Sequence, residues 1–173
     1  MTSAVPTIET ERLCLRGWRN EDAEPLAALF QDEDTPRFLG GSGSYPQAWR
    51  TAATEAGHWV LRGYGAWAVE QRESHIFVGC VGIWHPGEWP EQELSWHVVP
   101  SQRSRGFATE AAIASRRYAY ETLGMTTLVS YIAPENAPSI RVAERLGCER
   151  DGEVDLSGKT RLVFRHPSPQ AAQ

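Results

Sequence analysis

Short stretches in which apolar and polar residues alternate recur along this chain, and a period of two predicts β-strands. Leu13 and Leu15, for example, alternate with polar neighbours within residues 12–18. Runs rich in branched and aromatic residues predict five further strands, at residues 65–70, 76–84, 93–99, 127–132 and 161–165. Short polar or Pro/Gly linkers join the first three of these five, so we expect an antiparallel meander there.

Apolar residues at helical spacing predict helices between the strands. One helix follows an acidic start, a second ends at Gly63, an alanine-rich third ends at Gly124, and a fourth ends at Gly147. Their predicted ranges are 23–30, 46–61, 109–123 and 138–146. The order strand, two helices, three strands, helix, strand, helix, strand predicts an α+β fold with one mixed sheet.

Length and composition restrict the class of protein further. The chain has 173 residues, enough for one domain but too few for two full-sized cores. We place the domain at residues 8–165 and expect residues 1–7 and 166–173 to fray, because they are small, polar or proline-bearing and lack periodicity. A net charge of −5 argues against a nonspecific nucleic-acid coat. Few, scattered cysteines and the lack of a long apolar run predict a cytoplasmic protein that does not enter membranes. The histidines and cysteines show no metal-ligand spacing, so we expect no metal.

Residues 96–110, WHVVPSQRSRGFATE, hold the most informative pattern in the chain. A predicted strand runs through Pro100 into a polar loop and then through Gly106 into the start of a helix. The first N–H groups of a helix are unpaired and carry partial positive charge, and a glycine lets an anion approach the backbone. Arg103 and Arg105 add charge, so the loop predicts a phosphate site. An ordinary strand-to-helix connection with surface arginines is the alternative.

Arg103-x-x-Gly106-x-Ala108 resembles the pyrophosphate loop of the GCN5-related N-acetyltransferases (GNAT), which bind acetyl-CoA. The longer run 100–111 is similar to the RimJ/RimL-like branch, which acetylates ribosomal-protein N-termini. The opening ETERLCLRGWRNEDAEPL and the downstream Asn136-Ala137-Pro138-Ser139 with RVAERLG match the family in order. The resemblance implies a single domain whose mixed, mostly antiparallel, twisted sheet has about six or seven strands and about four flanking helices.

The resemblance also implies how acetyl-CoA is held. The strand at 93–99 is expected to carry a bulge and to splay from the strand at 127–132, which leaves main-chain groups free. The pantetheine arm would pair with residues 97 and 98 like an added strand, and the Val98 N–H would polarise the thioester carbonyl. The implied cofactor-binding residues are His97, Val98, Val99, Arg103, Ser104, Arg105, Gly106, Phe107, Ala108, Thr109, Asn136 and Ser139.

For the leaving thiolate, relatives often use a tyrosine, but Ala143 stands at the matching position. In the RimJ/RimL-like branch a serine faces the CoA sulfur, which implies this role for Ser139, with Asn136 holding pantetheine or a water. Both residue types are also favoured as helix caps, and this alternative stays open.

Three sources of the general base stay open. Strand alternation places Glu93, Ser95, His97 and Val99 on one face of the strand at 93–99. His97 titrates near neutral pH, Glu93 is able to act through a water, and a water chain alone is the third option.

The acceptor pocket implied by the resemblance lies between residues 38–49 and 154–160. Tyr45, Trp49 and Trp84 are the candidate acceptor-binding residues, because aromatic rings attract ammonium groups. Rings that only fill the core are the alternative.

We therefore expect an acetyl-CoA-dependent N-acetyltransferase that acts on a primary amine, either a protein N-terminus or a small molecule. Transfer would be direct in a ternary complex, without a metal, and the protein would be a monomer or a homodimer. A noncatalytic CoA-binding module and a protein-binding adaptor are the competing interpretations.

Overall fold

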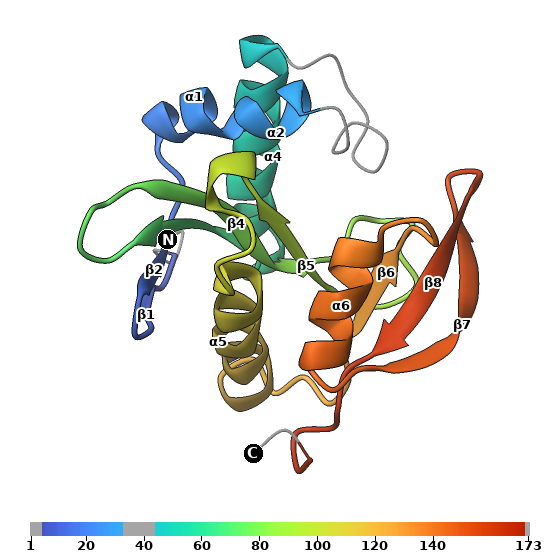
Figure 1. Ribbon diagram of the computed structural model, residues 1–173. Helices are drawn as coiled ribbons and strands as arrows, with labels where there is room; N and C mark the ends of the chain where they lie inside the picture. The colour runs from blue at the N-terminus through green and yellow to red at the C-terminus, as the bar shows by residue number, and fades with distance from the viewer. Residues whose placement is uncertain (1–4, 33–43, 172–173) are drawn as a thin grey trace.

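The computed structural model describes residues 5–32 and 44–171. In this part of the chain eight strands form one mixed sheet in the order β1-β2-β3-β4-β5-β6-β8-β7 (Figure 1). The strands are β1 Ile8–Glu9, β2 Leu13–Arg16, β3 Ala66–Gln71, β4 Phe77–Trp84, β5 Glu93–Val98, β6 Val129–Ile132, β7 Glu149–Leu156 and β8 Lys159–Arg165. All pairs are antiparallel except β5 with β6, which confirms the predicted α+β class, the mixed sheet and the meander.

Helices cover both faces of the sheet. The 3₁₀ turn η1 (Asn20–Asp22), α1 (Ala23–Leu26), α2 (Ala28–Gln31) and α4 (Tyr45–Arg62) lie on one side, and α5 (Phe107–Glu121) lies on the other (Figure 1). The 3₁₀ turn η2 (Pro100–Gln102) precedes α5, and α6 (Ala137–Arg145) packs beside β6. The predicted helix at 23–30 is divided into α1 and α2 at Ala27, and the other three predicted helices are present with slightly shifted ends.

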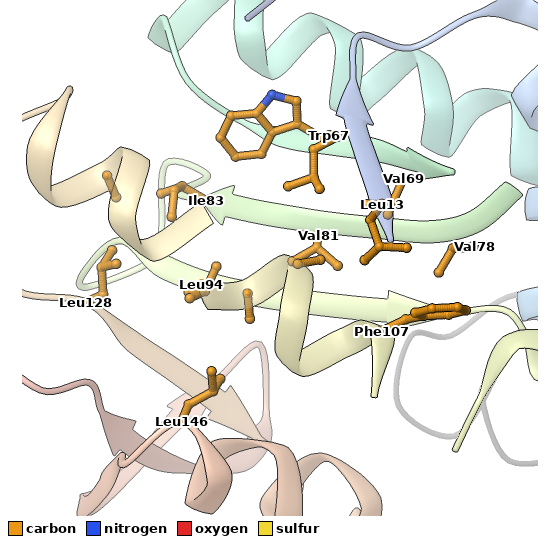
Figure 2. Packing of buried hydrophobic residues seen from close by; sticks show 14 of the residues in the cluster. Leu13, Trp67, Val69, Val78, Val81, Ile83, Leu94, Phe107, Leu128 and Leu146 are labelled. Atoms are coloured by element: carbon orange, nitrogen blue, oxygen red, sulfur yellow. The ribbon is translucent and has the colours of Figure 1, made fainter. Parts of the chain in front are cut away.

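Strand alternation builds the larger apolar core between the sheet and α5. Leu13, Trp67, Val81 and Leu94 come from four neighbouring strands and are completely or almost completely buried, and α5 contributes Phe107 to the same cluster (Figure 2). A smaller cluster on the opposite face joins Ala68 and Phe77 to α1, α2 and α4. The two clusters hold β3, β4 and β5 rigid between two helical layers.

Two strands, β1 and β7, give no recognisable strand pattern in the sequence. β7 is exposed on both faces along most of its length, so it lacks the apolar alternation that marks a strand. It is held by its ladder to β8 instead. β1 has only two residues, too few for any periodic signal.

The prediction that the ends fray outside residues 8–165 is wrong at both boundaries. The Pro6 carbonyl accepts a hydrogen bond from Trp67 Nε1 at 2.8 Å. His166 is 3% exposed, and the Pro167 carbonyl accepts from the Tyr120 hydroxyl at 2.7 Å. These contacts are made by partners far away in sequence, so local composition does not reveal them.

The expected bulge in the strand at 93–99 is also in a different place. β5 pairs with β4 in unbroken register from Gly79↔Val98 to Trp84↔Glu93. The register shift lies between β3 and β4, at Val69/Glu70. Gly79, next to that shift, has φ 148°, and a Cβ there would lie 1.9 Å from the His97 carbonyl oxygen. Only glycine therefore fits where β4 meets β5 at this point.

Candidate active site

β5 and β6 separate soon after they meet. These parallel neighbours share a single register pair, Glu93↔Val129, after which the ladder ends. On the other edge of β5, the Val99 N–H donates to the Val78 carbonyl at 2.9 Å. Because antiparallel main-chain bonds alternate, residues 93, 95 and 97 direct their main-chain groups to β4, and residues 94, 96 and 98 direct theirs toward β6. We call the gap between the separating strands the fork.

Side chains satisfy some of the main-chain groups at the fork. The Leu94 carbonyl accepts from the Ser130 hydroxyl at 2.6 Å, and the Val98 carbonyl accepts from Arg103 Nε at 3.0 Å. The N–H and C=O of Trp96 and the N–H of Val98 have no ladder partner in residues 5–32 and 44–171. The fork therefore offers an unpaired strand edge, presented by Trp96 and Val98.

His97 occupies a different position from the one expected. It is paired with Cys80, so its main chain faces β4, and the residue that presents an edge beside Val98 is Trp96. Burial lowers the pKa of His97 to about 4. At neutral pH its imidazole is therefore uncharged and a poor proton acceptor.

The loop from Arg103 to Thr109 forms a cluster of main-chain donors at the end of the fork. Ser104 and Gly106 have φ values of 59° and 80°, and Gly106 is the N-cap residue of α5. In the described chain the N–H groups of residues 104–109 donate to no main-chain carbonyl. Successive N–H groups in such a turn, at a helix N-terminus, form an anion-binding concavity. The chemistry of this loop fits a diphosphate, as the sequence predicts.

Arginines support the loop from outside. Arg103 pairs with Asp32 at 2.8 Å and with the Val98 carbonyl, so it anchors the loop to β5 and to the end of α2. Arg105 donates to Gln102 Oε1 at 2.7 Å and lies over the Phe107 ring. Arg12, which sequence reasoning missed, donates to the Arg105 carbonyl at 2.9 Å. Arg12 is far from the loop in the sequence, so no local pattern reveals its contact with Arg105.

The start of α6 is closed by Asn136. Its Oδ1 accepts from the Ser139 N–H at 3.2 Å, so the helix-cap interpretation is confirmed for this side chain. Ser139 is half-buried in the first turn of α6, and this helix packs against β6.

Glu93, at the base of the fork, has a buried carboxyl group. Its Oε2 accepts from Trp89 Nε1 at 2.6 Å, and its Oε1 accepts from the Tyr131 N–H at 3.4 Å. Burial raises the pKa of Glu93 to about 7, against the opposing effect of these two hydrogen bonds. A carboxyl group with this pKa exchanges a proton readily at neutral pH.

A second buried carboxyl group, Glu55, was missed by the sequence analysis. Glu55 lies on the inward face of α4, in line with Ala48, Ala52 and Trp59. Its Oε2 is buried and has no hydrogen-bond partner among the described residues. Burial and the nearby charge of Glu93 raise the pKa of Glu55 to about 8. A glutamate within the apolar stripe of a predicted helix was the available signal.

Next to Glu93, the ladder between β4 and β5 includes a pair of small residues. Gly82 is paired with Ser95, and the flanking pairs are Cys80 with His97 and Trp84 with Glu93. Burial and the charge of Glu55 raise the pKa of Cys80 well above its usual value, so its thiol stays protonated. This state disfavours a nucleophilic cysteine at the site.

The three predicted acceptor-binding rings do not meet in one place. Tyr45 and Trp49 are about half exposed at the N-terminal end of α4, and Trp49 donates to Asn20 at 3.0 Å. Trp84 stacks on His58 with ring centroids 4.8 Å apart, about 20 Å along α4 from Tyr45. Trp84, His58 and Leu61 line a surface groove of about 360 Å³. Of the expected pocket segments, residues 38–43 lie outside the described residues.

No helix in residues 5–32 and 44–171 is long and apolar enough to span a bilayer. No group of three or more His, Cys, Asp or Glu side chains in the same part gathers in a metal-binding arrangement.

Comparison with known proteins agrees with this geometry. Residues 12–149 match the family described as Acetyltransferase (GNAT) domain. The chain is 33% identical over 149 residues to a Bacillus subtilis (strain 168) protein named Uncharacterized N-acetyltransferase YnaD, and the match covers 84% of each chain. The structure of an acetyltransferase from Agrobacterium tumefaciens str. C58 is 34% identical, with TM-score 0.84, over 96% of this chain and 97% of the other. A Vibrio cholerae structure described as a proposed ribosomal-protein-serine acetyltransferase is 25% identical, with TM-score 0.79, over 94% and 98%.

The raised pKa of Glu55 predicts that stability falls as pH rises. The carboxyl group ionises near pH 4.5 when unfolded but near pH 8 in the fold, so the folded state binds the extra proton between these values. The contribution of Glu55 to the free energy of unfolding should then fall by up to about 1.4 kcal/mol per pH unit across this range. Glu55→Gln should flatten the fall, as measured by urea denaturation at pH 5 and pH 8. The control Glu73→Gln removes an exposed carboxylate and should follow the wild-type curve. Equal slopes in all three proteins would contradict the buried position of Glu55.

Proposed function

The chain belongs to the GNAT family of acetyltransferases, and on this premise we propose that it transfers the acetyl group of acetyl-CoA to a primary amine by direct transfer in a ternary complex. The observation that carries the proposal is the continuity of the donor loop at residues 104–109 with the unpaired edge of β5 at Trp96 and Val98. A diphosphate and an extended amide chain need these two kinds of site in this order.

The loop residues would bind the diphosphate of the cofactor through their main-chain N–H groups. The N–H groups of Ser104, Arg105, Gly106, Phe107, Ala108 and Thr109 would donate to the diphosphate, and Gly106 keeps the approach open because it lacks a Cβ. Three residues would support the site without contacting the diphosphate. Val99 is buried beside the turn, Arg103 ties the loop to β5, and Asn136 caps α6.

The fork would hold the reacting end of acetyl-CoA. Trp96 presents an N–H and a C=O that suit the amide groups of an extended arm, and the Val98 N–H is available to the thioester oxygen. A fixed donor aimed at developing negative charge contributes roughly 3 kcal/mol to the rate.

We assign the general base to Glu93. Its pKa of about 7 suits removal of a proton from an ammonium at neutral pH, whereas a pKa of about 4 makes His97 ineffective. With a pKa of about 8, Glu55 is mostly protonated at neutral pH, so it would leave the ionised form of the pair to Glu93. The deprotonated amine attacks the carbonyl carbon, the C–S bond breaks, and the nitrogen of the new amide releases its second proton to water. The Ser139 hydroxyl would stabilise the departing thiolate by hydrogen bonding. Coenzyme A has a thiol pKa near 8.5, so full protonation by an acid is unnecessary.

We place the enzyme in the RimJ/RimL-like branch, with an N-terminal amine or a small-molecule amine as the acceptor. The similarity to the Vibrio cholerae structure supports the first acceptor class. The two buried carboxyl groups support any acceptor that arrives as an ammonium.

The test of this function is amine-dependent release of free CoA. Acetyl-CoA should yield thiol in the presence of at least one class among N-terminal peptides, polyamines and aminoglycosides, and mass spectrometry should show the product 42 Da heavier. Binding of acetyl-CoA without release across all three classes would favour the noncatalytic module, and absence of binding would favour the adaptor.

Gly106→Ala should raise the Kd for acetyl-CoA at least tenfold. The added Cβ would lie 3.4 Å from Arg12 Nη2 and would narrow the donor loop, and the positive φ adds strain of about 1 to 2 kcal/mol. Gly124→Ala is the matched control, because Gly124 has φ 68° beyond the other end of α5 and open space around it. Calorimetric titration should separate the two variants, which share the strain. Equal affinities would remove the loop from the cofactor site.

Glu93→Gln should lower kcat about 100-fold. In the wild type kcat should rise with pH around a pKa of about 7, and the variant should lack this rise. Glutamine keeps an oxygen for the Tyr131 N–H across the fork and loses the bond from Trp89 Nε1, which does not cross the fork, so the fork should stay intact. His97→Gln should retain the same rise in the pH profile. If that rise disappears in His97→Gln and persists in Glu93→Gln, our assignment of the base is wrong.

A further inference from the structure

A chain of buried polar groups ends at the fork and has no part in the chemistry above. It runs from Arg116 on α5 through His166 to Ser130 on β6 and then to the Leu94 carbonyl on β5. The exposed fractions of Arg116, His166 and Ser130 are 8%, 3% and 2%. Arg116 Nη1 lies 3.4 Å from His166 Nδ1, His166 Nε2 lies 2.9 Å from Ser130 Oγ, and Ser130 Oγ lies 2.6 Å from the Leu94 oxygen.

The chemistry of the four groups allows one arrangement of hydrogens. A carbonyl only accepts, so the Ser130 hydroxyl hydrogen points to Leu94. Ser130 Oγ then accepts from His166, which must carry its hydrogen on Nε2. The lone pair left on Nδ1 accepts from Arg116, which only donates. Burial and the charge of Arg116 lower the pKa of His166 to about 3, which keeps the imidazole in this neutral form. The direction of every bond is therefore fixed.

Separate elements of the fold hold His166 in place. Its N–H donates to the Leu128 carbonyl at 3.0 Å, and the Tyr120 hydroxyl on α5 fixes the next residue through the Pro167 carbonyl. Arg116 Nη1 also donates to the Leu146 carbonyl at 2.7 Å. Leu94, Leu128 and Leu146 belong to one apolar cluster, and Figure 2 shows their side chains near one another. We call this chain of hydrogen-bonded groups, Arg116, His166 and Ser130, the relay. It is anchored on α5 and on both strands of the fork.

Ser130 lies where the ladder between β5 and β6 ends. One residue earlier the main chains still pair, whereas at this point the hydroxyl spans the added distance to the Leu94 carbonyl. A bond of the same kind crosses the gap in the opposite direction, because Glu93 Oε1 on β5 accepts from the Tyr131 N–H on β6. Two reciprocal side-chain bonds therefore define how far the strands have separated where the unpaired edge begins.

We propose that Arg116, His166 and Ser130 are positioning residues that set the width of the fork and, through it, the binding of the acetyl-CoA thioester arm. This inference rests on the proposed function. If it holds, α5 shapes the cofactor site at two points. The N-terminus of α5 lies at the donor loop, and Arg116 on α5 supports the fork. Residues after β8, which look like a tail in the sequence, become part of the active-site support.

Ser130→Ala removes the hydrogen bond to the Leu94 carbonyl and leaves the ring Nε2–H of His166 without its acceptor. We expect at least a tenfold rise in the Kd and KM for acetyl-CoA, with the KM of the amine unchanged. Ser130→Thr restores the hydroxyl on a residue that suits a strand and should return the Kd to within about threefold of wild type. Ser115→Ala is the matched control. Ser115 on α5 is also fully buried, and its hydroxyl has no hydrogen-bond partner among the described residues, so its loss should leave the Kd unchanged.

A double-mutant cycle separates positioning from stability. His166→Phe should raise the Kd about as much as Ser130→Ala, and the double variant should show no further rise, because both changes interrupt the same relay. Binding is measured by titration with acetyl-CoA alone, so the result does not depend on finding the acceptor. An unchanged Kd in Ser130→Ala and His166→Phe, with stability lowered, overturns the proposal, and so does an additive double variant. Failure of the wild type to bind acetyl-CoA would refute the proposed function first.

Discussion

The requirement that buried main-chain groups find hydrogen-bond partners governs this molecule at the point where β5 and β6 separate. A sheet that opens leaves donors and acceptors unpaired on both strands, which is tolerated only where something else satisfies them. Ser130, Glu93 and Arg103 satisfy three of these groups with side chains, at Leu94, Tyr131 and Val98. The main-chain N–H and C=O of Trp96 and the N–H of Val98 have no ladder partner in the described residues and would be free to pair with an extended ligand. The site therefore arises from an incomplete ladder inside an otherwise well-paired sheet.

Helix α5 links the fork to the donor loop at residues 104–109, and the N-terminus of the helix contributes partial positive charge to that loop. The loop relies on main-chain N–H groups and on the helix end, since Arg103 is bound to Asp32 and to β5. The guanidinium groups of Arg12 and Arg105 both lie over the Phe107 ring, and Arg12 also pairs with Glu110. These cations thus hold the loop in the conformation that aims its amides, in addition to raising the local potential.

Sequence reasoning succeeded where the information is local and failed where it is not. The meander, the later helices and the turn at Gly106 follow from periodicity and from a glycine that needs a positive φ within a few residues. The strand β7 was missed because it is solvated on both faces. His166 was missed because its burial depends on Arg116 and Ser130, which are distant in sequence. Glu55 carried a weak local signal as a carboxyl group in an apolar stripe, but its pairing with Glu93 depends on how α4 lies on the sheet.

The paired carboxyl groups of Glu55 and Glu93 show how the fold gives up stability at its site. Burial disfavours a charge on either group, and a charge on Glu93 disfavours one on Glu55, so near neutral pH the pair retains a proton that water would remove. An ammonium bound near these groups would reverse this balance, because a nearby cation stabilises both charged forms and lowers both pKa values. The acceptor would in this way promote ionisation of the base that deprotonates it. A neutral ligand of the same shape lacks this effect, so under the proposed function the site would favour a cationic acceptor by charge as well as by fit.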